Sequence, residues 1–305
     1  MRITNNTLTG NYLRNLNRNL KQMQKYQNQL STGKEISKPS DNPILVARVM
    51  GLDNNIRTNE QYGRNIDDSL GWTDTADGAM NEITSVVQRA RELVVYGANG
   101  SLSDTDRLAL RDEVEMLKGQ MVQMLNTNYD GRFIFGGQKT TEPPFSIGAD
   151  DKMTYAGGKN ADGEGLISRE IAQGVSIHIE SDGSQITTAD DAITKDFGAL
   201  LDNVILAMEN GDTDSLSGEL LGDMDAHLDN VIRFRSKMGA VYNRLEAAKE
   251  RNASESLSMT ELLSKSEDID LAEKMMEFSM MSTVYQASLS TGAKILQPSL
   301  LDYIR

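Results

Sequence analysis

The strongest structural signal of the chain lies in residues 44–95, which read ILVARVMGLDNNIRTNEQYGRNIDDSLGWTDTADGAMNEITSVVQRARELVV. Apolar side chains recur there three and four residues apart, a spacing typical of a helix that packs along one seam. The seam, with a slip of phase near residues 73–76, comprises Leu45, Val49, Leu52, Ile56, Ile66, Leu70, Met80, Ile83, Val87, Ala90 and Val94. One continuous helix over this stretch would be about 78 Å long, far longer than a compact domain needs. Glycines at 63, 71 and 78 can bend or interrupt it, at about 1 kcal/mol each relative to alanine.

A shorter seam precedes this stretch and ends in a loop. Its apolar members are Leu13, Leu16, Leu20, Met23 and Leu30, and Gln27 is its one polar member. Prolines and turn-forming residues cluster at 33–43, which predicts a loop. Asn42 then serves as a helix cap, and Pro43 suits the first turn of the long helix.

Downstream, the period of the pattern changes twice. Residues 101–106 supply caps for a third helix, whose seam comprises Leu110, Val114, Leu117, Met121 and Met124. Between 130 and 191 the apolar residues alternate, as in Val175, Ile177 and Ile179, and glycine-containing pairs at 157–158, 162–163 and 182–183 suggest turns. This region predicts a small antiparallel β insert. Helical spacing returns at 197–208 and from 220 to about 249.

The last predicted helix follows a loop near 252–268. Asp270 and Glu273 form a start that resembles a capping box. The seam behind it is Leu271, Met275, Phe278, Ser282, Tyr285, Leu289, Gly292 and Leu296. The predicted fold is therefore mainly α: an elongated, coiled-coil-like antiparallel bundle built from both ends of the chain. We expect terminal segments at 1–43 and 266–305, a helical body at 44–130 and 191–265, and an outer β-rich insert at 131–190.

The two ends carry opposite charge. Residues 1–38 hold seven basic side chains and one acid, a net of +6, whereas residues 266–305 hold six acids and three bases, a net of −3. Opposite charge beside two apolar seams favours pairing of the terminal helices, within one chain or between chains. The alternative is a pair of solvated amphipathic faces in a monomeric bundle.

Composition excludes several classes of function. The 305 residues include no cysteine and carry a net charge of −14, which rules out thiolate chemistry and disfavours nucleic acid as a partner. No apolar run approaches the roughly 20 residues of a membrane helix, and residues 1–10 do not resemble a cleaved leader, so we expect no membrane insertion. The only histidines, His178 and His227, have no ligand-like partner in sequence. We expect no catalytic, cofactor or metal site, and no enzyme.

Several motifs carry a resemblance to a known family. They are the start MRIT, Gln29–Lys34 (QLSTGK) before Pro39–Pro43 (PSDNP), Gln88–Leu93 (QRAREL), Asp130–Gly137 (DGRFIFGG), the pair Glu267-Asp268, and the ending Ile295–Ile304 (ILQPSLLDYI). Together they resemble the flagellin superfamily, and the start and end resemble its hook-associated, junction-forming branch more than filament flagellin. The insert at about 138–190 lies where this family varies most.

The resemblance implies a structural protein of the bacterial flagellum. Such a protein is exported through the type III channel without a cleaved leader and assembles as a ring between hook-associated protein 1 and flagellin. Its expected partners are further copies of itself, those two proteins and a flagellar export chaperone. Filament flagellin, and an unrelated secreted helical adhesin, are the alternatives.

We hypothesise that residues 1–43 and 266–305 are poorly ordered in the isolated subunit and complete their fold on assembly. Polar interruptions at Gln27, Ser282 and Gly292 motivate this view, since each gives up apolar burial. The predicted assembly interface comprises Leu13, Leu16, Leu20, Met23, Leu30, Leu271, Met275, Phe278, Tyr285, Leu289 and Leu296. Gln88–Leu93 resembles the flagellin segment read by an animal immune receptor, but a solvated helix face is the preferred interpretation.

Overall fold

The computed structural model of the chain describes residues 5–36, 38–158, 166–188 and 196–295. Most of them are helical, which confirms the mainly α prediction. The helices are α1 (Asn5–Thr32), α2 (Pro43–Gly97), α3 (Asp104–Leu125), α4 (Ser184–Thr187), α5 (Phe197–Asn210), α6 (Thr213–Ser217), α7 (Glu219–Glu267) and α8 (Leu271–Ile295). The chain divides into two compact units, a first of residues 1–58 with 255–305 and a second of residues 59–254. Both boundaries lie inside long helices, α2 and α7.

The predicted end of α1 and the predicted starts of α2 and α3 are confirmed, whereas α1 begins at Asn5, eight residues before the first seam residue Leu13. A loop separates α1 from α2, and Asn42 Oδ1 accepts a hydrogen bond from the Leu45 amide at 3.2 Å, as a helix cap does. Ser103 caps α3 in a reciprocal capping box with Asp106. These caps can be predicted from local sequence because each capping side chain accepts a hydrogen bond from a backbone amide that the first helical turn leaves without a partner.

Helix α2 is a single helix of 55 residues, so its glycines do not interrupt it. Gly71 lies directly against the hydroxyl of Tyr129, where a methyl group would clash. Tyr129 in turn meets the Trp72 ring edge to face, at 6.2 Å between centroids. The glycine therefore serves the close approach of an aromatic side chain to the helix, which offsets its poor helix propensity.

The predicted loop near 252–268 is wrong, because α7 continues to Glu267. The stretch is rich in serine. In the structure hydroxyl groups of the stretch bond to backbone carbonyls one turn back, as Thr260 does to Ser256 at 2.8 Å and Ser266 does to Leu262 at 2.7 Å. Such bonds let polar residues continue a helix on its exposed side.

The described residues of the β-rich insert and its border form three two-stranded antiparallel sheets. They pair β1 (Asn128–Tyr129) with β2 (Arg132–Phe133), β3 (Phe145–Ile147) with β4 (Met153–Tyr155), and β5 (Leu166–Ala172) with β6 (Val175–Glu180). The turn between β5 and β6 contains Gly174, whose φ of 71° suits glycine. Asp182 and Gly183, predicted as a turn between strands, instead lead into α4. The predicted turn at 162–163 lies outside the described residues.

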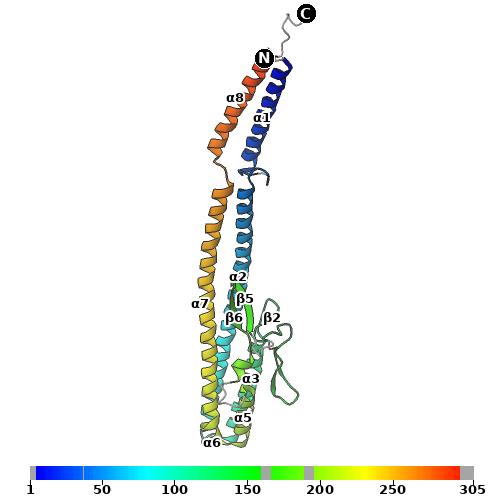
Figure 1. The fold of residues 1–305 in the computed structure, drawn as a ribbon. Coiled ribbons are helices and arrows are strands. Elements are labelled where there is room, and N and C mark those ends of the chain that lie inside the picture. Colours follow the sequence, from blue (N-terminus) through cyan, green and yellow to red (C-terminus); the bar gives the residue numbers. More distant parts are fainter. Residues whose placement is uncertain (1–4, 37, 159–165, 189–195, 296–305) are drawn as a thin grey trace, which may run out of the picture. The chain divides into compact units, whose positions relative to one another are not determined.

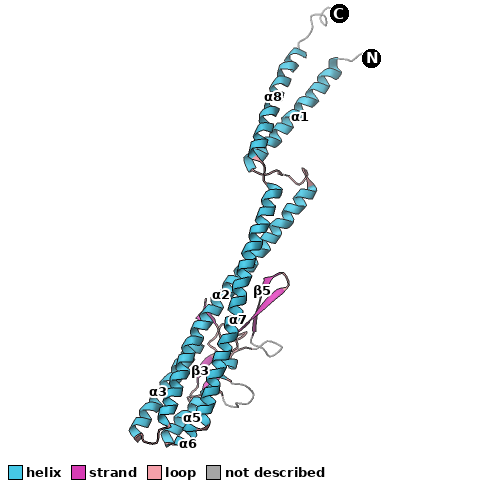
Figure 2. Cartoon of the chain, turned by 90° about the vertical axis from the view of Figure 1, so that its left-hand side faces the viewer, coloured by secondary structure: helices cyan, strands magenta, loops and turns pink. Residues whose placement is uncertain are grey.

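The core of the second unit forms where α2, α3, α5 and α7 pack together (Figures 1 and 2). Its fully buried members include Ile83, Val114, Leu201 and Phe234, and Phe135 and Phe145 of the insert join them. A smaller cluster fixes the β5–β6 hairpin, since Ile171 and Ile177 pack against Ile66, Leu245 and Ala248. The insert is thus packed onto the helices through apolar contacts.

Two polar contacts cross the interior of the second unit. Lys118 of α3, only 2% exposed, pairs with Asp202 of α5 at 2.6 Å and also donates to the Asp151 carbonyl. Asn59 of α2 and Asn252 of α7 bond reciprocally: each side-chain amide donates to the other residue's backbone carbonyl, at 3.0 and 2.9 Å. Because buried amides are costly when unpaired, this pair favours one alignment of the two long helices.

Candidate assembly interface

Helices α1 and α8 pack against each other along the first unit (Figure 2). The Tyr12 hydroxyl donates to the Ser288 carbonyl at 2.8 Å, and the Tyr12 ring lies against Gly292, where a larger side chain would clash. Asn19 reaches the Ser288 hydroxyl at 3.5 Å. The α1 side of this seam is therefore Tyr12, Leu16, Asn19, Met23, Tyr26 and Leu30, again three and four residues apart, and all of these side chains are partly buried.

The structure brings together some residues of the predicted interface and leaves others exposed. Leu16, Leu20, Met23, Leu30, Phe278 and Tyr285 are partly buried. Exposed are Leu13 at 46%, Leu271 at 55%, Met275 at 59% and Leu289 at 44%. Leu296 lies outside the described residues. Sequence reasoning missed Tyr12, Asn19, Tyr26 and Ser288 because a seam chosen only by apolar character passes over tyrosine, asparagine and serine.

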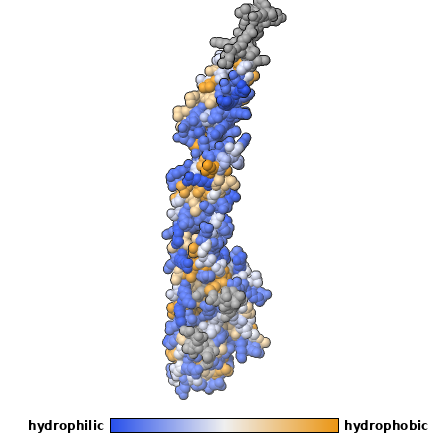
Figure 3. All heavy atoms as spheres, viewed as in Figure 1, coloured by the Kyte–Doolittle hydropathy of each residue, from blue (hydrophilic) through white to orange (hydrophobic). Residues whose placement is uncertain are grey.

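The pair buries very little apolar surface. Among the described residues of the first unit, no apolar side chain is fully buried, whereas the second unit has a continuous core. Besides Leu271 and Met275, α8 exposes Met276, Met280 and Val284, at 67%, 65% and 43%. Figure 3 shows apolar residues interspersed among polar ones on the face in view. A helix pair with this much unburied apolar surface can gain stability from a further partner.

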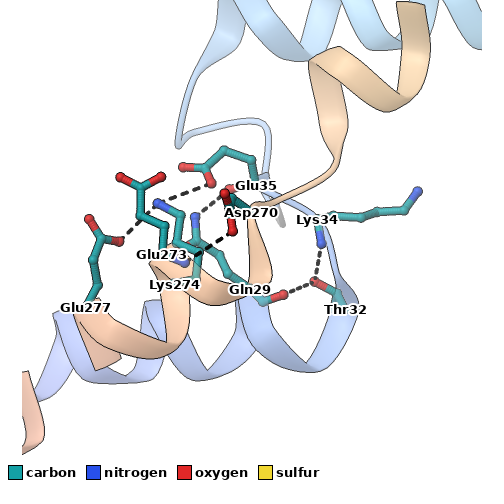
Figure 4. A network of polar contacts seen from close by, with 8 residues as sticks. All are labelled: Gln29, Thr32, Lys34, Glu35, Asp270, Glu273, Lys274 and Glu277. Carbon is teal, nitrogen blue, oxygen red and sulfur yellow. Dashed lines mark hydrogen bonds and ion pairs between the residues drawn. The ribbon is translucent and has the colours of Figure 1, made fainter. Parts of the chain in front are cut away.

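A polar network closes the end of the pair where α1 stops and α8 starts (Figure 4). The backbones bridge there: the Glu35 amide donates to the Glu267 carbonyl at 2.7 Å, and the Ile269 amide to the Gly33 carbonyl at 3.1 Å. Gly33 ends α1 with a φ of 73°, a conformation that glycine adopts at little cost. The Gln29 amide, which is buried, donates to the Glu35 carbonyl at 2.7 Å.

Two lysines form ion pairs with the carboxylates of this network. The Lys34 amine contacts Glu267 at 2.7 Å, and that hydrogen bond raises the pKa of Lys34 above its ordinary value. Lys274 lies between Glu277 at 3.1 Å and Glu35 at 3.4 Å, 5.8 Å from the centre of the Tyr26 ring. Burial alone lowers the pKa of Lys274, but the two carboxylates outweigh it, so the pKa is raised. Both amines therefore stay charged at neutral pH.

The two histidines lie apart in the second unit. His178 is exposed on β6, whereas His227 is buried against Phe197, with 5.2 Å between ring centroids. In the described part of the chain, no group of three or more acidic or histidine side chains is arranged to hold a metal ion. None of the described helices is long and apolar enough to span a bilayer.

The Gln88–Leu93 segment takes part in contacts between helices. Arg89 pairs with Glu113 of α3 at 2.7 Å and with Glu92 at 3.0 Å, and Arg91 pairs with Asp225 of α7. These arginines therefore join α2 to its neighbours at the surface of the second unit, which is more than the solvated face predicted from the sequence.

Comparison with known proteins identifies the family. The bacterial flagellin N-terminal helical region matches residues 3–140, and the bacterial flagellin C-terminal helical region matches residues 221–304. Flagellar hook-associated protein 3 of Escherichia coli (strain K12) is 27% identical over 94% of this chain and 95% of its own length. Flagellin of Bacillus subtilis (strain 168) is 30% identical over 97% of both chains.

Solved structures share the fold. The crystal structure of flagellar hook-associated protein 3 from Legionella pneumophila matches with a TM-score of 0.63 and 14% identity, over 71% of this chain and 98% of that one. Both helical ends of the chain thus match the two conserved regions of one family, and residues 141–220 lie between them. The chain belongs to the bacterial flagellin family.

Proposed function

We propose that this chain joins the hook to the filament of the bacterial flagellum. In this proposal it is exported through the type III channel, with a chaperone on its C-terminal segment. It then assembles as a ring between hook-associated protein 1 and flagellin. The full-length similarity to hook-associated protein 3 of Escherichia coli supports the junction role.

The observation that carries an assembly role is the incomplete burial of the α1–α8 pair. Leu13, Leu271, Met275 and Leu289 belong to the predicted interface but remain exposed in the single chain. Burial of one such side chain contributes about 1.5–3 kcal/mol, so contact with neighbouring subunits would stabilise the assembled form. No catalytic role is proposed.

Filament flagellin is the second candidate. The flagellin of Bacillus subtilis aligns with this chain over 97% of both lengths at 30% identity, a higher identity than that of the Escherichia coli hook-associated protein. A flagellin would polymerise by itself into long filaments, whereas a junction protein would form a short assembly and permit flagellin to grow on it.

Deletion and complementation in the source bacterium separate these roles. For a junction protein, deletion leaves hooks while flagellin is lost to the medium, and the restored chain brings back filaments. If deletion removes only the filament polymer and leaves intact junctions, the chain is a flagellin. No flagellar defect would contradict both.

Limited proteolysis of the isolated chain tests whether the terminal segments fold on assembly. We expect the first cuts within the first unit, because without buried apolar side chains its local unfolding costs little free energy. A fragment spanning much of residues 59–254 should persist and be identified by mass spectrometry. Equal resistance of both units would contradict the hypothesis.

A further inference from the structure

Helix α1 carries four cations on one face. Arg14, Arg18, Lys21 and Lys25 follow one another at intervals of four, three and four residues, and α1 contains no acidic residue. At 3.6 residues per turn they line up about half a turn around the helix from Leu16 and Met23, which face α8. The first three are exposed and Lys25 is partly exposed. We call these four residues the basic stripe.

The basic stripe makes no ion pair with the described residues of the chain. Among the described residues, no carboxylate lies within ion-pair distance of any of its four members, and Arg14 bonds only to the neutral Asn11. Like charges one turn apart on a helix repel each other, so the stripe by itself destabilises α1. The electrostatic pairing predicted from the charges of the two ends therefore does not run along the α1–α8 seam.

A segment of matching and opposite charge lies at the start of α8. Residues 267–277 hold five acids and one base, a net of −4, against +4 for residues 14–25. Within the chain, Glu267 pairs with Lys34 and Glu277 with Lys274, while Glu273 is exposed and makes no ion pair with a described residue. Leu271 and Met275 are exposed in the same segment. We call residues 267–277 the acidic segment.

We propose that the basic stripe of one copy docks on the acidic segment of a second copy. The two segments carry opposite net charge, and exposed apolar residues accompany both: Leu13 precedes Arg14 in sequence, and Leu271 and Met275 lie within the acidic segment. The stripe points away from its own α8, so a neighbour is the partner that this geometry favours. Because the two surfaces differ, the contact is heterologous and can repeat from copy to copy around a ring. The inference rests on the proposed function only in requiring that copies meet through their α1–α8 pairs.

A charge exchange tests the contact in the complemented bacterium. Three variants are compared with the wild type: R18E/K21E, D268K/E273K and their combination. The control, R48E/R57E, makes the same change of charge as R18E/K21E, but on exposed residues of α2 in the same unit. Asp270 is left intact because it accepts hydrogen bonds from the amides of Ala272 and Glu273 at the start of α8.

R18E/K21E alone and D268K/E273K alone should each reduce the number of filaments per cell by about tenfold or more, because like charges across an interface cost several kcal/mol. The combined variant should recover most of that loss, and the control should resemble the wild type. Zero-length cross-linking of mixed isotope-labelled copies in isolated flagella should join Lys21 or Lys25 of one copy to the acidic segment of another. Circular dichroism and secretion into the medium check that each variant folds and is exported.

The inference is overturned if the wild type restores filaments but the combined variant performs no better than the worse single exchange. It is also overturned if wild-type chain binds phosphatidylglycerol vesicles, R18E/K21E does not, and no cross-link between copies forms; the stripe would then serve an anionic membrane. If the wild-type chain itself does not restore filaments, that result contradicts the proposed function, and with it the requirement that copies meet in the flagellum.

Discussion

Substitution of Asp202 by alanine is expected to lower the free energy of unfolding by about 3–5 kcal/mol, since it leaves the buried Lys118 amine without its counterion. Lys118 is 2% exposed, and its remaining partner is the neutral carbonyl of Asp151. Urea unfolding followed by circular dichroism measures the effect. The second unit should be the part that loses stability, because Lys118, Asp202 and Asp151 all belong to it.

The matched control is Lys118→Met, which replaces the cation with an apolar side chain of similar length. It should cost less, about 1–2 kcal/mol, because the Asp202 carboxylate left behind is 26% exposed and can be hydrated. The double variant K118M/D202L should be close to the wild type. If K118M were as damaging as Asp202→Ala, packing around the lysine stem, and not the uncompensated charge, would explain the stability.

The pair of substitutions L271Q/M275Q is expected to abolish filament formation while leaving the isolated chain folded. Both side chains are more than half exposed in the single chain, so glutamine, a good helix former, should change its stability by less than about 0.5 kcal/mol. On assembly, burial of the exposed half of these two side chains would contribute about 1.5–3 kcal/mol in all, so its loss would weaken association by roughly tenfold to a hundredfold. Electron microscopy of complemented cells measures filament number.

The pair L108Q/M116Q on α3 is the control for that prediction. These residues are 41% and 70% exposed and lie in the second unit, so the chemical change is comparable and the site differs. Normal filaments in the control together with their loss in L271Q/M275Q would support assembly through α8. Equal loss in both would indicate a general effect of surface polarity on export or solubility, and normal filaments in both would remove α8 from the interface.

Local patterns predicted the helices well where the pattern and the caps agreed. The seam of α2, its Asn42 cap and the capping box at Ser103 each describe interactions within a few residues, so the sequence contains them in full. The predicted loop near 252–268 was wrong because serine, threonine and asparagine are ambiguous: their side chains bond to the backbone in loops and in helices alike. The Asn252 amide reaches the Asn59 carbonyl of α2, a tertiary contact that the local sequence does not show.

The candidate site was harder to predict, because it depends on which face of each helix meets the other. The apolar positions of α1 suggest a seam through Leu13 and Leu20, but Tyr12, Asn19 and Tyr26 meet α8 instead. Gly292 admits the Tyr12 ring, and that tertiary contact turns α1 by a fraction of a turn. The opposite charges of the two ends meet in part: α1 and α8 pair within the chain, and Lys34 bonds to Glu267 and Lys274 to Glu35, whereas the basic stripe makes no ion pair with a described residue.

The reciprocal amides of Asn59 and Asn252 also bear on how the chain refolds. Two long helices with repeating apolar seams can pair nearly as well when one slides past the other by a heptad. Such a slide would place the Asn252 amide opposite Leu52 or Ile66 and leave it without a partner, at a cost of about 1–3 kcal/mol. A single pair of side chains thus favours one alignment of α2 and α7 over several that resemble it when the chain folds.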